Sequence, residues 1–135
     1  MDPFVGQIML TALYFAPQGW VFCDGATLSV SDNENQALFS LINNIYGGDG
    51  YTTFCVPDLR GAIPMGMNYS SAPIYPLGMT GGSATQTPLA RGASTNSGSI
   101  RMTYTAGEIP HDNLPPFTGL SYIICVQGLY PVRPD

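Results

Sequence analysis

The chain carries very little charge. Lysine is absent from its 135 residues, and four arginines against nine acidic residues give a formal net charge of −5. Charged residues make up 10% of the chain, against about 25% in an average soluble domain. Because nucleic acids and anionic lipids attract basic surfaces, this composition argues against binding to either. A surface of uncharged polar side chains would explain the low charge, but burial in an assembly is favoured, because interface cores are depleted of charge.

Long apolar runs are also missing. No stretch approaches 18 apolar residues, so the sequence predicts no insertion into a membrane. The N-terminus has no basic group before its first apolar stretch, which Pro17 interrupts. We therefore expect no secretory signal and folding in a reducing cytosol.

The residues that usually carry chemistry are few. Cys23, Cys55 and Cys125 are odd in number and lie in apolar contexts, which is typical of buried reduced thiols rather than of a disulfide or a zinc site. His111 is the only histidine. Since no nucleophile–base set, carboxylate pair or metal cluster stands out, the sequence predicts no enzyme, no catalytic residues, no cofactor and no metal site.

The remaining sequence predicts an α+β fold, a small β-rich domain with one short helix and a long Ser/Gly/Thr-rich loop. An apolar stripe of Ala37, Leu38, Leu41, Ile42 and Ile45 has helical spacing. The helix is expected from about Glu34 to Asn44, with Ser31 opening a capping box and Gly47 as its C′ residue. Strands are expected over four further ranges: 5–11, 20–23, 52–56 and 100–104. Trp20, in the second range, is expected in the core.

The C-terminal range 121–127 is almost entirely apolar. We expect it to form the last strand and to be central and buried on both faces. By contrast, residues 68–99 have neither a helical nor a strand period, and Arg91 is their only charged residue. A stretch of this length without regular structure is usually functional or disordered.

Short turns with aspartate and glycine punctuate the N-terminal half. Asp24 and Asp49 each precede a glycine, and Asp58-Leu59-Arg60-Gly61 follows Pro57. Aspartate bonds nearby backbone amides in such turns, so we interpret Asp24, Asp49, Asp58 and Arg60 as structural turn residues. A charged functional pair of Asp58 and Arg60 is the alternative. A phosphate loop is disfavoured, because the glycines at 47–50 follow the helix instead of preceding it.

Two segments, FAPQGWVFCDG at 15–25 and NQALFSLINNIYGGDGYTTFCVPDLRG at 35–61, resemble the phage tail-collar family, which includes the microcystin-dependent proteins. Residues 114–131 resemble the closing segment of that family, and the resemblance spans roughly 4–66 and 108–133. It implies one tail-collar-like domain over 1–135, with a collar motif at 1–67, a variable loop at 68–99 and closing strands at 100–135.

The resemblance implies a structural and adhesive component of a phage tail fibre or baseplate, or of a phage-like contractile injection particle. Such a protein is made in the bacterial cytoplasm and ends in the virion tail or in an extracellular particle. The expected partners are two further copies in a homotrimer, other tail-fibre or baseplate proteins, and a host surface glycan or protein. The alternative function is a passive connector or plug of the tail tip that binds no receptor.

Contact with a receptor or partner is expected around the variable loop, whose Ser, Thr, Asn and Gly residues with interleaved tyrosines are typical of binding loops. The candidate contact residues are Tyr69, Tyr75, Arg91 and Tyr104. Tail-fibre relatives often hold an axial metal with a His-x-His pair near this region. Here residues 109–113 read IPHDN, so the second histidine is missing and the sequence predicts no metal from this pattern.

Overall fold

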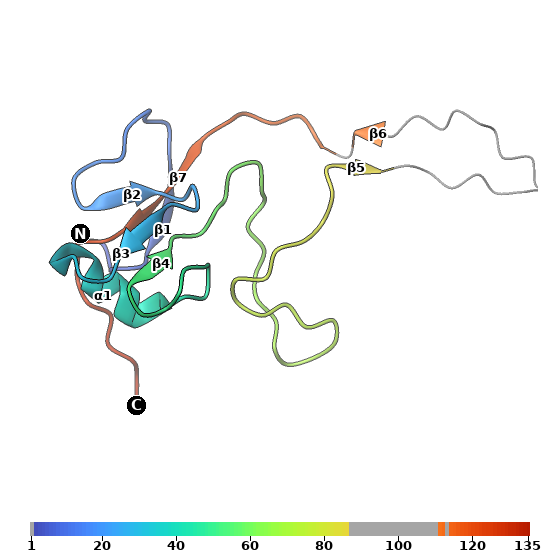
Figure 1. The fold of residues 1–135 in the computed structure, drawn as a ribbon. Coiled ribbons are helices and arrows are strands. Elements are labelled where there is room, and N and C mark those ends of the chain that lie inside the picture. Colours follow the sequence, from blue (N-terminus) through green and yellow to red (C-terminus); the bar gives the residue numbers. More distant parts are fainter. Residues whose placement is uncertain (1, 87–110, 113) are drawn as a thin grey trace, which may run out of the picture. The chain divides into compact units, whose positions relative to one another are not determined.

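The protein is described by a computed structural model that covers residues 2–86, 111–112 and 114–135 (Figure 1). The chain forms two compact units, which we call the main unit (Met1–Met79 and Gly119–Asp135) and the inserted unit (Thr80–Thr118). The predicted fold class is confirmed, since the described elements are short strands and one helix: β1 (Ile8–Thr11), β2 (Trp20–Phe22), β3 (Thr27–Ser29), α1 (Asn33–Ile42), β4 (Thr53–Cys55), β5 (Thr85–Gln86), β6 (His111–Asp112) and β7 (Ser121–Cys125).

The main unit is built around a three-stranded antiparallel sheet of order β1-β7-β2 (Figure 1). Ile124 of β7 pairs with Ile8 of β1 on one side and with Val21 of β2 on the other. The last strand therefore lies between the first two, and its residues 123–125 are buried. The predicted central position is confirmed, but the strand ends at Cys125 and Gln127 is exposed.

A second, two-stranded sheet joins β3 to β4, with Leu28 opposite Phe54. The strand β3 was not predicted, because its sequence Thr-Leu-Ser is short and mostly polar. The strand β4 ends two residues before Pro57, as expected for a residue that cannot donate to a ladder. This sheet contributes Phe54 to the core of the main unit.

Both ends of α1 differ from the prediction. Asp32, not Ser31, is the N-cap residue, and its carboxylate accepts the amide of Glu34 at 3.2 Å. The helix ends at Ile42, two residues before the predicted Asn44, and Asn43 is its C-cap residue in place of Gly47. Asn43 has a φ of 47° and donates its amide to the Phe39 carbonyl, so the chain leaves the helical path here.

The core lies between α1 and the two sheets. Seven buried residues form it: Val5, Cys23, Leu38, Phe54, Val56, Ile124 and Val126. Leu38 comes from the helix, and Leu41 and Ile42 of the helix are partly buried against this core. Ile45 was wrongly assigned to the buried stripe. It is 43% exposed because the helix has already ended and the helical phase is lost.

Trp20 was also misassigned. The neighbouring Val21 packs against the core, and side chains alternate along a strand, so Trp20 and Phe22 lie on the opposite face of β2. Trp20 is only partly buried there and is not among the residues packed on the core.

Cys23 and Cys125 are buried free thiols, while Cys55 is partly buried and also free. Among the described residues, no helix is long and apolar enough to cross a membrane.

The inserted unit contains one short antiparallel ladder. Thr85 of β5 pairs with Asp112 of β6, and Gln86 pairs with His111. The predicted strand at 100–104 lies outside the described residues. The ladder pairs residues that flank 87–110 in the sequence.

Candidate functional site

The turn before β4 is organised by Asp49. Its carboxylate accepts the backbone amides of Tyr51, Thr52 and Thr53 at 2.8–2.9 Å and the Thr52 hydroxyl at 2.6 Å. These bonds favour the ionised carboxylate and therefore lower the pKa of Asp49 far below its usual value. The turn is bonded to itself and leaves this carboxylate little capacity for a ligand.

Gly48 makes this turn possible. Its φ is +92°, and a Cβ atom at this position would lie 2.5 Å from the Cα atom of Phe54. Only glycine allows both the left-handed backbone and this close approach. The turn therefore packs directly on the backbone of β4.

The second turn cluster lies at the other end of β4. Asp24 and Asp58 form an isolated bridge, and the Asp24 carboxylate accepts the amide of Ala26. The Asp58 carboxylate accepts hydrogen bonds from the backbone amide of Arg60 and from Nε and Nη2 of its guanidinium group, the last two at 2.9 Å each. The structure thus brings Asp24, Asp58 and Arg60 together and leaves Asp49 separate.

Hydrogen bonds from the Arg60 side chain and amide lower the pKa of Asp58 to about 2. The same bond with Asp58, followed by the charges of Asp58 and Asp24, raises the pKa of Arg60. The pair is exposed, with 70% of the Arg60 side chain accessible. Its electrostatic contribution to stability is therefore small.

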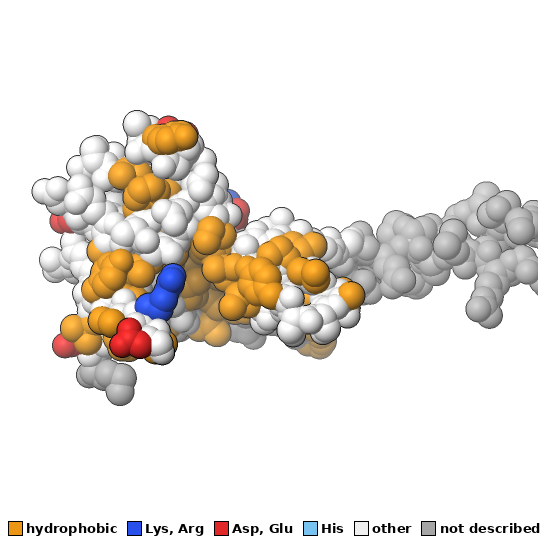
Figure 2. All heavy atoms as spheres, turned by 90° about the horizontal axis from the view of Figure 1, so that it is seen from below, with side chains coloured by type: hydrophobic (Ala, Val, Ile, Leu, Met, Phe, Trp, Pro, Cys, Tyr) orange, Lys and Arg blue, Asp and Glu red, His pale blue; other side chains and the backbone are white. Residues whose placement is uncertain are grey.

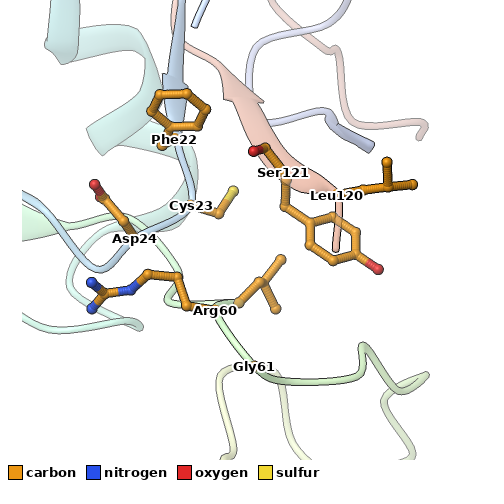
Figure 3. Close-up of a pocket in the computed structure, with 9 residues that line it drawn as sticks. Phe22, Cys23, Asp24, Arg60, Gly61, Leu120 and Ser121 are labelled. Carbon is orange, nitrogen blue, oxygen red and sulfur yellow. The ribbon is translucent and has the colours of Figure 1, made fainter. Parts of the chain in front are cut away.

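A pocket of about 350 Å³ lies beside this cluster (Figure 3). It is lined by the end of β2, the Arg60 turn and the beginning of β7: Phe22, Cys23, Asp24, Leu59, Arg60, Gly61, Leu120, Ser121 and Tyr122. Figure 3 shows Arg60 extending beside Asp24 and not across the pocket toward Leu120. The pocket thus combines apolar walls with an already paired charge at its edge.

The chemistry of this pocket does not favour catalysis. Burial, followed by the charge of Asp24, raises the pKa of Cys23 to about 11, so its thiol stays protonated and a weak nucleophile at neutral pH. Within the described ranges, no group of three or more His, Cys, Asp or Glu side chains could hold a metal ion.

Two of the four candidate contact residues, Tyr69 and Tyr75, lie in the main unit. Tyr69 is 59% exposed and its hydroxyl accepts the amide of Leu77, while Tyr75 is partly buried and exchanges two backbone bonds with Asn68. The other two candidates, Arg91 and Tyr104, lie outside the described residues.

An apolar surface follows the Arg60 turn in the chain. We call residues 63–79 the 63–79 segment; six of its large apolar side chains are 57–77% exposed: Ile63, Met65, Met67, Tyr69, Ile74 and Met79. The sequence carries a signal of this surface, since residues 61–90 contain no charged residue. Figure 2 shows apolar side chains gathered over the stretch that follows this turn.

The turns and the small antiparallel sheets are those of a structural domain, in which the turn aspartates bond nearby backbone amides and the Arg60 side chain. Residues 6–64 match the model of the Phage Tail Collar Domain. These residues are a tail collar domain, as the resemblance implied. The match to this domain indicates a structural role in a phage tail fibre, which would place the protein in the virion tail. The chain matches no curated protein significantly.

Proposed function

We propose that this tail-fibre component also contributes to host attachment, through residues 87–110 of the inserted unit. The observation that carries the proposal is the β5–β6 ladder, which pairs the residues that flank this stretch, Thr85 with Asp112 and Gln86 with His111. The inserted unit lies outside the matched collar range and interrupts the main unit between Met79 and Gly119. A rigid scaffold that carries an inserted segment is a common arrangement for binding loops.

The composition of residues 87–110 supports a polar receptor such as a surface glycan or protein. The stretch is rich in Ser, Thr and Gly residues and also contains Asn96, Arg91 and Tyr104. Small polar residues supply adaptable hydrogen bonds, and tyrosine supplies rigid contact area at low entropic cost. Of the four candidate contact residues, we assign Arg91 and Tyr104 to this role.

We further propose that the chain assembles as a homotrimer and joins other tail-fibre or baseplate proteins. The absence of lysine and the large exposed apolar surface support assembly. In this proposal Asp24, Asp49, Asp58 and Arg60 stabilise turns and do not bind a ligand. A passive connector is the second candidate function, and the exposed 63–79 segment favours it.

Replacement of residues 88–109 tests the attachment role. The variant carries a short Gly/Ser linker between β5 and β6, and a control carries a Gly/Ser stretch of the original length. Both are compared with the wild type for oligomeric mass and for adsorption of labelled protein to the host strain. We expect unchanged mass and loss of adsorption in both variants.

Full adsorption with unchanged mass would exclude these residues as the receptor contact and would support the passive connector. A point variant refines the result, because Arg91→Ala with Tyr104→Ala should weaken adsorption while Arg133→Ala should not. Equal loss with Arg133→Ala would point to charge alone and contradict the proposed site.

A further inference from the structure

The 63–79 segment is ordered by bonds within itself. Asn68 and Tyr75 exchange two backbone hydrogen bonds of 2.8 Å. The Asn68 side-chain amide donates to the carbonyls of Ser71 and Pro73, and the amide of Leu77 donates to the Tyr69 hydroxyl. These bonds define the conformation of the segment without burying its apolar side chains.

One point of the segment approaches the rest of the main unit very closely. Gly78 has a φ of +83°, and a Cβ atom there would lie 2.6 Å from Cγ2 of Ile45. The exposed Ile45, just beyond α1, thus has the 63–79 segment as a neighbour. The segment is held in a defined shape while its apolar side chains remain accessible.

The accessible apolar area is large enough for a stable interface. A large side chain offers about 200 Å², so six side chains exposed by 57–77% present roughly 700 Å². A standard interface takes about 800 Å² from each partner. A monomer seldom leaves so many large apolar side chains of one short segment in water.

The charge of the segment restricts the partner. No charged residue occurs from 61 to 90, so the segment offers nothing to a charged surface, and its exposed groups are mainly methionine, isoleucine and tyrosine. Unbranched methionine side chains adapt well to an apolar partner. A second copy of the chain presents the same uncharged apolar surface at the same concentration.

We propose that the 63–79 segments of neighbouring copies pack against one another and form the subunit interface of the oligomer. Around a three-fold axis, equivalent segments from all three copies meet, so each apolar surface covers another. This inference rests on the self-assembly proposed above and assigns Tyr69 to a subunit contact and not to the receptor.

A charge placed in the interface tests the inference. The double variant Met65→Glu and Met67→Glu adds two like charges to each copy, and Val132→Glu is the matched control at a side chain that is 88% exposed outside the segment. Sedimentation velocity at micromolar concentration gives the mass. We expect the wild type and the control at three times 14.4 kDa and the double variant at 14.4 kDa, with unchanged circular dichroism.

The outcomes separate this inference from the broader proposals. A double variant that keeps the wild-type mass would overturn the proposed interface but not self-assembly. A monomeric wild type would overturn self-assembly itself. Neither measurement involves host cells, so both are independent of the attachment role.

Oxidation by peroxide identifies what covers the segment if the double variant fails to fold. In the wild-type oligomer, peroxide should oxidise Met65, Met67 and Met79 more slowly than their exposure in a single copy predicts. Dilution to the monomer should remove this protection from oxidation. Protection that is independent of concentration would mean that another part of the same chain covers the segment. That result, or oxidation at full rate in the oligomer, would overturn the inference.

Discussion

The main unit uses its large apolar side chains in two different ways. Around β7 and α1, residues such as Leu38, Phe54 and Ile124 are buried to 1% exposure or less. In the 63–79 segment, chemically similar residues such as Ile63 and Met65 are 77% and 68% exposed. Both regions have polar residues that bond the local backbone, Asp49 in one and Asn68 in the other. A defined conformation therefore does not require burial, and the second region retains its apolar surface for a partner.

The largest expected effect compares truncations in the two regions. Leu38→Ala and Phe54→Ala should lower the free energy of unfolding by about 2–5 kcal/mol, because each leaves a cavity among residues that cannot collapse. Leu41→Ala, at a partly buried site, should cost less than Leu38→Ala. Ile63→Ala should cost less than about 0.5 kcal/mol in the isolated subunit. Urea denaturation below the dissociation concentration measures all four, and equal losses at Leu38 and Ile63 would remove the distinction between the regions.

The next effect concerns two glycines with positive φ. Gly48→Ala should cost about 2–4 kcal/mol, since it combines left-handed strain with a clash against the Phe54 backbone. Gly61→Ala should cost only about 1–2 kcal/mol, because nothing lies within 4 Å of its Cβ position and only the strain remains. Thermal unfolding of the two variants checks the order. A larger loss at Gly61 would mean that the segment following this turn is packed more tightly than the exposed surface indicates.

Acid should affect the turns of the core region and leave the Asn68 turn unchanged. The folded pKa of Asp58 is about 2, below its ordinary 3.8, and that of Asp49 is also lowered. A carboxyl group whose pKa is lower in the folded state stabilises the fold at any pH above its pKa in the unfolded chain. This stabilisation is lost as the pH falls toward 2. Asp49→Asn should therefore be less stable than the wild type at pH 6, and the difference should shrink by pH 2. A difference that is constant over this range would show that the charge of Asp49 has no part in it.

The smallest expected effect lies at the junction of the two regions. Arg60→Ala removes an exposed pair and should lower the melting temperature only slightly. Adsorption should change no more than stability does. Loss of adsorption at an unchanged melting temperature would instead make Arg60 a ligand residue and would direct attention to the pocket beside it.

Much of the main unit follows from short-range patterns in the sequence. The spacing of Leu38, Leu41 and Ile42 predicts the helix, the apolar run at 121–127 predicts the central strand, and Asp-Gly pairs predict the turns. The motifs within residues 6–64 also indicate the tail-collar family. These features depend on periodicity, turn chemistry and residue types that act over a few positions, so a sequence displays them directly.

Tertiary structure alone decided which of these apolar residues are covered. The partly buried position of Trp20 outside the core, the end of α1 before Ile45 and the pocket between Arg60 and Leu120 depend on elements that are distant in sequence. The 63–79 segment is the clearest case, because its sequence alone does not show whether its apolar side chains are covered. Burial is set by what the rest of the chain places against a side chain, and the described structure leaves Met65 and Met67 exposed.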